Sequence, residues 1–263
     1  MKKLVYHVAA FVMLSVLFAS CSQDRTVKIV SYNVGTFTKF EENSMSMIAD
    51  MMKELGADAV SMNELDSCTA RTGRQYQLEQ FASRMGGWQY RFGSAMPYDG
   101  GSYGDGLAVS RDSKVLDAWS VRLPQAGGAE PRALVVMELD GYVMASTHLD
   151  HVSDSARVEQ AKVITEVLKD RYGKSGKPVF LCGDMNARPG SAPMREFARE
   201  WKFVTQDTPT FPSGTPDVCI DYILALDNGA EYEVVQTSVP QEFSSGDTAK
   251  ASDHLPVLAE IRL

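Results

Sequence analysis

The sequence predicts an α/β protein in which two packed β-sheets are covered by helices. Runs of alternating apolar and β-branched residues, which are typical of strands, outnumber the segments with helical spacing, and the two kinds are interspersed along the chain. No repeat, proline-rich linker or low-complexity run divides the chain. Many strands with a few interspersed helices favour mixed layers over one purely parallel wound sheet.

The individual elements follow from these patterns. Strands are predicted at 27–32, 59–62, 107–110, 133–139, 142–147, 179–182, 219–224, 232–237 and 257–261. Helices are predicted at 45–55, 76–85, 155–169 and 193–200. Gly56 and the pair Gly86-Gly87 directly follow the first two helices, as expected for residues that end a helix.

Residues 1–20 read as an export signal, because two lysines precede an apolar run that ends in small residues. The small residues lie directly before Cys21, which resembles a bacterial lipoprotein signal with Cys21 as the lipid-bearing residue. Ordinary secretion with a coincidental cysteine is the alternative. A spanning anchor is disfavoured, since a bilayer needs about 20 apolar residues. We therefore expect one domain over residues 24–263, exported and anchored through lipid at the outer membrane, in the periplasm or at the cell surface.

The charge of the chain constrains its partners. The formal net charge is −8, and lysine and arginine form no cluster that resembles a nucleic-acid footprint. This counts against tight nonspecific binding of DNA. It does not exclude a nuclease, because metal ions can neutralise a phosphate locally.

Polar residues that suit metal or phosphate chemistry recur at the ends of the predicted strands. Any one of them alone is more often a turn former than a functional group. Several strand ends that converge, however, can build a pocket on a rigid scaffold. The residues in question are Asn33, Glu64, His148, Asp184, Asn186, Asp221, Asp253 and His254.

Short motifs around these residues resemble a known superfamily. They are YNV at 32–34, NELD at 63–66, THLDH at 147–151, GDMN at 183–186, IDYI at 220–223 and SDH at 252–254. Together and in this order they resemble the endonuclease/exonuclease/phosphatase superfamily, which includes deoxyribonuclease I, abasic-site endonucleases, sphingomyelinases and inositol polyphosphate phosphatases. The resemblance implies a deoxyribonuclease I-like four-layer α/β sandwich, in which two mixed β-sheets are flanked by helices and the site lies at one edge between the sheets.

The resemblance also implies a divalent metal. Mg²⁺, or alternatively Mn²⁺, prefers oxygen ligands and needs only one or two carboxylates besides substrate phosphate. Glu64 matches the metal-binding glutamate of the superfamily. Asn33 and Asp253 are further candidates, either directly or through water.

Catalytic roles are implied for five residues. Asp184 and Asn186 match the pair that binds and activates the attacking water. His254 would act as general base or, when protonated, as a donor to a phosphoryl oxygen, with Asp221 holding its other ring nitrogen. Contact with Asp221 would raise the pKa of His254. His148 matches a histidine that contacts phosphate and protonates the leaving group in some members.

Two arginines are candidates for binding the substrate phosphate. Arg132 begins an apolar strand and Arg157 lies near the start of a helix. Each could instead pair with acidic groups near the site. For His151, a functional role and a surface role are equally compatible with the sequence.

The sequence thus predicts an exported, divalent-metal-dependent phosphoester hydrolase, expected to be a monomer. Its substrate could be a small organic phosphate, nucleic acid or a phospholipid head group, so an extracellular nuclease and a sphingomyelinase-like enzyme stay open. Export disfavours DNA repair. A catalytically inactive surface binding module is the alternative from another class, and the presence of all the motif residues argues against it.

Overall fold

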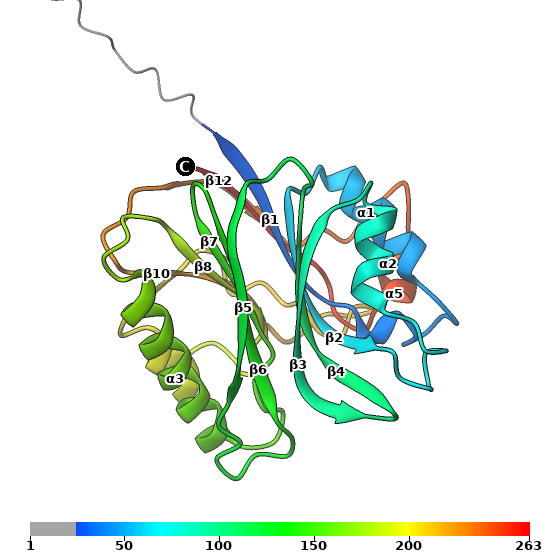
Figure 1. Ribbon diagram of the computed structural model, residues 1–263, viewed down its shortest axis with the longest axis horizontal. Coiled ribbons are helices and arrows are strands. Elements are labelled where there is room, and N and C mark those ends of the chain that lie inside the picture. The colour runs from blue at the N-terminus through cyan, green and yellow to red at the C-terminus, as the bar shows by residue number, and fades with distance from the viewer. Residues whose placement is uncertain (1–24) are drawn as a thin grey trace, which may run out of the picture.

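Two six-stranded β-sheets pack face to face in this computed structural model, which describes residues 25–263 (Figure 1). In the first sheet the strand order is β11-β12-β1-β2-β4-β3, and in the second it is β5-β6-β7-β8-β10-β9. The predicted signal in residues 1–20 and the predicted lipid site at Cys21 lie outside the described residues.

The strands and helices have the following bounds. The strands are β1 Thr26–Asn33, β2 Ala59–Ser67, β3 Gln89–Tyr98, β4 Gly101–Val109, β5 Val115–Leu123, β6 Arg132–Leu139, β7 Val143–Thr147, β8 Val179–Asp184, β9 Trp201–Phe203, β10 Asp221–Leu226, β11 Glu233–Ser238 and β12 Val257–Arg262. The helices are η1 Gly35–Phe37, α1 Met45–Leu55, α2 Gln77–Arg84, α3 Asp154–Tyr172, α4 Ala192–Phe197 and α5 Thr248–Ala251.

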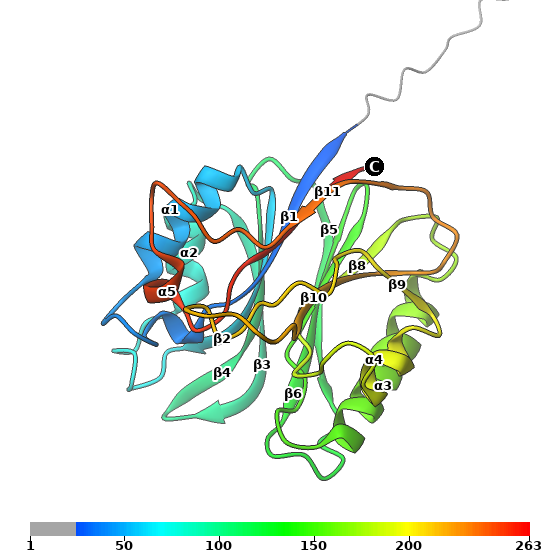
Figure 2. The same cartoon turned by 180° about the vertical axis from the view of Figure 1, so that it is seen from behind.

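Three apolar clusters separate four layers. One lies between the first sheet and helices α1 and α2, a second between the two sheets, and a third between the second sheet and helices α3 and α4. Strand β1 shows how the sequence produces this, because alternate side chains of a strand face opposite sides. Val27 and Ile29 pack between the sheets, whereas Val30 and Tyr32 pack beneath the helices. Figure 2 shows α3 and α4 together on the outer face of the second sheet.

The predicted four-layer sandwich is confirmed, and each of the nine predicted strands and four predicted helices has a counterpart. The strands that the sequence did not reveal are β3, β5 and β9, and all three lie at a sheet edge. Edge strands are less buried, so their residues alternate less clearly between apolar and polar, although the β-branched run of a fourth edge strand, β11, still predicts it. The partly exposed side chains of β3, β5 and β9 agree with this explanation.

The strand order brings the motif residues to one edge of the sandwich. β1 runs parallel to β2 in one sheet, and β7 runs parallel to β8 in the other, so each pair ends on the same side. β10 is antiparallel to β8, which places its first residue, Asp221, opposite the last residue of β8, Asp184. Within residues 25–263, no helix is long and apolar enough to cross a membrane.

Candidate active site

Four motif residues from both sheets meet at this edge. The amide nitrogen of Asn33 lies 3.0 Å from a Glu64 oxygen, 3.2 Å from an Asp184 oxygen and 3.4 Å from Nε2 of His254. Beside them opens a cavity of about 420 Å³, whose wall includes Lys39, Glu64, Tyr103, Glu130, Arg132, His148, His151, Asp184, Asn186, Phe211, Ile220 and His254. The strand ends therefore converge as the sequence predicts.

A β-bulge places Glu64 in the cavity. The pairing of β2 with β4 shifts between Met62 and Leu65, and Glu64 has a φ of 59°. A bulge of this kind redirects one side chain out of the regular alternation. Asn63, in the same bulge, donates to Asp105 at 2.8 Å and to the carbonyl of Thr147 at 2.9 Å. The bulge is thereby fixed to the opposite sheet.

The end of β8, which leads into a turn, requires its glycine. Gly183 has a φ of 147°, and a Cβ built on it would lie 1.8 Å from the carbonyl oxygen of Thr147. The turn continues with the backbone NH of Asn186 donating to Asp184 at 2.8 Å. The Asn186 side chain lies 2.9 Å from Nε2 of His148 and donates to the carbonyl of Leu149 at 3.0 Å. Asp184, Asn186 and His148 thus form one connected group.

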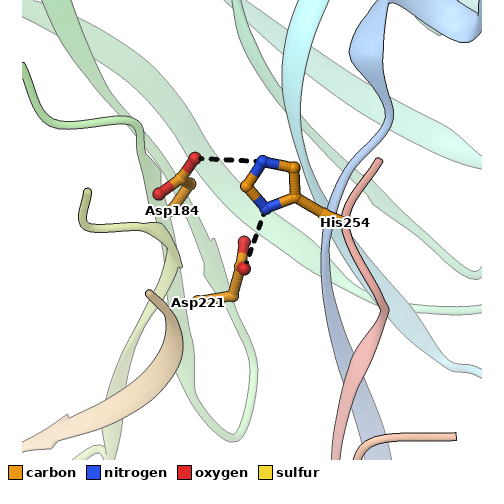
Figure 3. Close-up of side chains that lie close together, drawn as sticks. All are labelled: Asp184, Asp221 and His254. Carbon is orange, nitrogen blue, oxygen red and sulfur yellow. Dashed lines mark hydrogen bonds and ion pairs between the residues drawn. The ribbon is translucent and has the colours of Figure 1, made fainter. Parts of the chain in front are cut away.

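His254 joins the two sheets through carboxylates (Figure 3). Its Nδ1 lies 2.9 Å from Oδ2 of Asp221, and its Nε2 lies 3.6 Å from Oδ2 of Asp184. Asp221 also accepts a hydrogen bond from the hydroxyl of Thr210 at 2.5 Å. The ring of Phe211 packs on the imidazole, with ring centroids 4.9 Å apart. The predicted contact between Asp221 and His254 is present.

The two candidate arginines have different surroundings. Arg132 lines the cavity, where it pairs with Glu130 at 2.9 Å and lies 3.1 Å from Nδ1 of His151. Arg157 pairs with Asp154 and donates to the carbonyl of Asp150 at 2.7 Å, and it is not part of the cavity wall. Its guanidinium therefore stabilises the start of α3. Pairing with an acidic group was the alternative that the sequence left open for this arginine. The geometry gives no support to a phosphate contact at Arg157.

Comparison with known proteins assigns the family. A sequence model described as "Endonuclease/Exonuclease/phosphatase family" matches residues 30–254, which include the whole site from Asn33 to His254. The chain belongs to the endonuclease/exonuclease/phosphatase family. Curated protein sequences include no match to it. As a member of this family the chain is a phosphoester hydrolase, and the family depends on divalent metals.

Solved structures of family members share this fold. A mannosyl-6-phosphatase from Bacteroides thetaiotaomicron is 18% identical, with 89% of this chain and 99% of that chain covered and a TM-score of 0.73. A family member from Bacteroides vulgatus is 18% identical, with 91% and 100% covered and a TM-score of 0.73. The catalytic domain of human nocturnin, solved with bound sulfate, is 16% identical, with 91% and 96% covered and a TM-score of 0.67. At these identities the similarity establishes the shared fold.

Electrostatics distinguish the two histidines of this family site. Burial opposes the charged form of His254, but the carboxylates of Asp221 and Asp184 outweigh it and raise its pKa to about 10. Burial raises the pKa of Asp184 well above its usual range, with His254 opposing that shift. Burial and the nearby Arg132 lower the pKa of His148 well below its usual range. His254 is therefore a cation at neutral pH, and His148 is neutral.

Oxygen atoms on the chain fit the divalent metal of the family. Asp184, Asp221 and His254 lie close enough to form a metal-binding group. Asp221, however, already accepts from Thr210 and His254 through Oδ2. Glu64, on the cavity wall, and Asp253 offer further oxygen atoms. Oδ1 of Asp253, like Oδ1 of Asp221, is buried without a hydrogen-bond partner among the described residues, and Oδ2 of Asp253 pairs with Lys39 at 2.6 Å.

Asn33 is arranged differently from a direct ligand. Its side-chain oxygen accepts from the backbone NH of Gly35 at 3.1 Å, and its NH₂ group faces Glu64 and Asp184. In this arrangement Asn33 positions the two carboxylates. A ligand role for Asn33 stays a prediction, as do the roles of the other motif residues.

Several residues of the site lie outside the motifs. Lys39, Tyr103, Glu130 and Phe211 line the cavity, and Thr210 supports Asp221. Lys39, Glu130 and Phe211 come from loops, where no periodicity marks them. Tyr103 belongs to the start of β4, where glycines interrupt the apolar alternation, so the sequence did not predict that part of the strand. Only the folded chain brings them to the cavity.

Proposed function

We propose that this chain is an exported, Mg²⁺-dependent phosphoester hydrolase that acts on small organic phosphates. The observation that carries the proposal is the meeting of Asn33, Glu64, Asp184 and His254 between the two sheets, beside a cavity with cationic groups on its wall. A phosphoester needs charge neutralisation, an activated water and a stabilised leaving oxygen. The site has candidates for all three.

The metal would be held by Glu64 and Asp253, with Mn²⁺ as a possible replacement, and when bound it supplies positive charge next to the phosphoryl oxygens. Asp184 is the group that takes a proton from water, because burial makes its carboxylate more basic than usual. Asn186 orients that water through its amide. Its position 2.9 Å from His148 keeps the amide fixed.

The two buried histidines have different proposed roles. His254, charged at neutral pH, donates from Nε2 to a phosphoryl oxygen, while Asp221 holds Nδ1. His148 is neutral and buried, so it positions Asn186 and contacts the phosphate. Arg132, on the cavity wall, pairs with Glu130, and its buried Nε, which has no hydrogen-bond partner among the described residues, can donate to the phosphate.

Small phosphates are favoured over nucleic acid by charge. The chain is acidic, with 34 acidic against 26 basic side chains, whereas nonspecific nucleic-acid binding requires clustered cations. A structural relative named as a mannosyl-6-phosphatase supports a phosphorylated small molecule as the substrate class. An extracellular nuclease is the alternative function for the same fold.

Export and anchoring are proposed from residues 1–20 and Cys21. Palmitate labelling of cells that express the full chain tests them. We expect labelled protein in the membrane fraction and none from a Cys21→Ser variant. Equal labelling of both would reject lipidation at Cys21. Size-exclusion chromatography tests the expected monomer.

Metal dependence is tested with two chromogenic esters. Purified protein should hydrolyse p-nitrophenyl phosphate or bis-p-nitrophenyl phosphate with Mg²⁺ or Mn²⁺, and EDTA should abolish turnover until metal is added back. Folded, metal-loaded protein that hydrolyses neither ester, no sugar phosphate and no DNA or RNA would reject the enzyme and favour a binding module. Preference for DNA or RNA would favour the nuclease.

A further inference from the structure

A second cavity of about 350 Å³ adjoins the active-site cavity. The two cavities have Lys39, Glu64, Tyr103 and Glu130 in common as wall residues. The rest of the second wall consists of Gly35, Thr36, Thr38, Arg71, Met96 and Tyr98. Because the walls are shared, one molecule can place its phosphate in the first cavity and the group attached to that phosphate in the second.

Arg71 is held rigidly at this second cavity. Its Nε and Nη2 donate to the two oxygens of Asp66 at 2.7 and 2.8 Å. The guanidinium carbon lies 4.4 Å from the ring centroid of Tyr98 and 5.5 Å from that of Tyr103. Asp66 is fully buried and also accepts from Thr69 at 2.6 Å. A bidentate pair combined with aromatic contacts fixes the plane of the guanidinium.

This arrangement leaves one nitrogen of Arg71 available. Within the described residues, Nη1 of Arg71 takes part in none of the hydrogen bonds, although the other side-chain nitrogens do. Arg71 lines the cavity, and its Nη1 is a donor held in a fixed plane that can serve a ligand there. The side chain is 39% exposed, so a ligand can reach it.

The charges around the second cavity disfavour a second anion. Arg71 is neutralised by Asp66, and Lys39 is neutralised by Asp253 at 2.6 Å. Of the two glutamates on the same wall, Glu130 pairs with Arg132 at 2.9 Å and Glu64 is the proposed metal ligand. A second phosphate would therefore find no unpaired cation among the described residues of this wall. Neutral hydroxyl groups can instead donate to the carboxylates and accept from Nη1 of Arg71.

We propose that the second cavity binds the leaving group of the substrate and selects a neutral, polyhydroxylated group the size of a hexose, with Arg71 as a specificity-determining residue. Its volume lies in the range of small-molecule sites, about 300–1,000 Å³. The tyrosine and threonine hydroxyls on the wall provide further partners for sugar hydroxyls. The inference rests on the proposed function, because it names the substrate class of the same site.

Steady-state kinetics with matched phosphates test the inference. The full chain is assayed with mannose 6-phosphate, glucose 6-phosphate, glucose 1,6-bisphosphate and p-nitrophenyl phosphate at constant Mg²⁺. We expect kcat/KM for a hexose 6-phosphate to exceed that for the bisphosphate at least about 10-fold, a difference that one unfavourable charge contact can produce. The free hexose should inhibit competitively.

Variants assign the selection to the second cavity. Arg71→Ala should raise KM for the hexose phosphate about 10-fold with a smaller change in kcat, as for a lost hydrogen bond to a charged group. Tyr98→Ala is a second variant, for use if Arg71→Ala fails to fold. It leaves both members of the pair between Arg71 and Asp66 in place, and it should lower the preference for hexose phosphate over p-nitrophenyl phosphate. Arg111→Ala, an exposed arginine outside both cavities, is the matched control.

The outcomes separate the two proposals. Metal-dependent turnover of p-nitrophenyl phosphate with no preference for hexose phosphate over the bisphosphate would overturn the inference and leave the hydrolase intact. A preference that both variants retain would also overturn it, because selection would then lie elsewhere. Loss of metal-dependent turnover with every phosphoester would remove the proposed function, and this inference with it.

Discussion

Nδ1 of His254 lies 2.9 Å from Oδ2 of Asp221, so a residue that precedes β12 of one sheet is paired with the first residue of β10 in the other. The carboxylate helps raise the pKa of His254 to about 10. The contact therefore links the packing of the two sheets to the charge of the imidazole.

Asp221→Asn should move the pH dependence of turnover. Without the Asp221 charge the pKa of His254 falls, so the imidazolium is lost at a lower pH than in the native protein. We expect the alkaline limb of the kcat profile to shift toward acid by at least about one pH unit, equivalent to about 1.4 kcal/mol. An unshifted alkaline limb in a folded variant would contradict the role of His254 as a cation.

Asp184→Asn and His254→Ala should each lower kcat at least about 10²-fold, as expected for lost acid-base or electrostatic groups. Both residues line the cavity and both are buried. Initial-rate assays with p-nitrophenyl phosphate at saturating Mg²⁺ measure the change in kcat. Near-native kcat in either variant would reject the role given to that residue.

Glu64→Gln should weaken metal binding. The change keeps the size of the side chain but removes the charge that a hard cation prefers. We expect the Mg²⁺ concentration for half-maximal activity to rise at least about 10-fold, with partial recovery of kcat at high Mg²⁺. Glu166→Gln, on the exposed face of α3, is the control and should leave the metal titration unchanged. Identical titration curves for Glu64→Gln and native protein would exclude Glu64 as a ligand.

Gly183→Ala should destabilise the protein, because the new Cβ would lie 1.8 Å from the carbonyl oxygen of Thr147 at a φ of 147°. Relief requires backbone movement at the core of the site, and we expect a loss of about 3 kcal/mol or more in unfolding free energy. Gly190→Ala is the control, since its φ is 71° and no atom lies within 4 Å of the added Cβ. A loss of about 1 kcal/mol is expected there. Urea denaturation measures both, and equal losses would refute the steric argument.

His148 should make stability sensitive to mild acid. Its folded pKa is lowered well below 6.5, so below about pH 6.5 the unfolded chain gains a proton that the folded chain does not hold. Stability contributed by this group is therefore present above pH 6.5 and declines as the pH falls, by at most about 1.4 kcal/mol per pH unit. His148→Gln should lose less unfolding free energy between pH 6.5 and 5 than native protein. His151→Gln, at an exposed imidazole, is the control, and parallel slopes for native protein and His148→Gln would contradict the prediction.

Much of the site could be predicted from the sequence because its residues follow strands with clear apolar alternation. Glu64, Asp184 and His254 stand in short motifs in or beside such strands, and the order of the motifs along the chain indicates the family. The edge strands β3, β5 and β9 could not be predicted, since partial exposure weakens the alternation that marks a strand.

The sequence by itself predicted the layers, the family and the candidate residues of the site, because these depend on neighbours a few positions apart. The tertiary structure alone decided which groups meet. Asn33 contacts Asp184 across 151 positions, Arg132 lines the cavity while Arg157 binds the start of α3, and Lys39 pairs with Asp253. Such contacts depend on how two sheets pack, and the second cavity beside Arg71 exists only as a result of that packing.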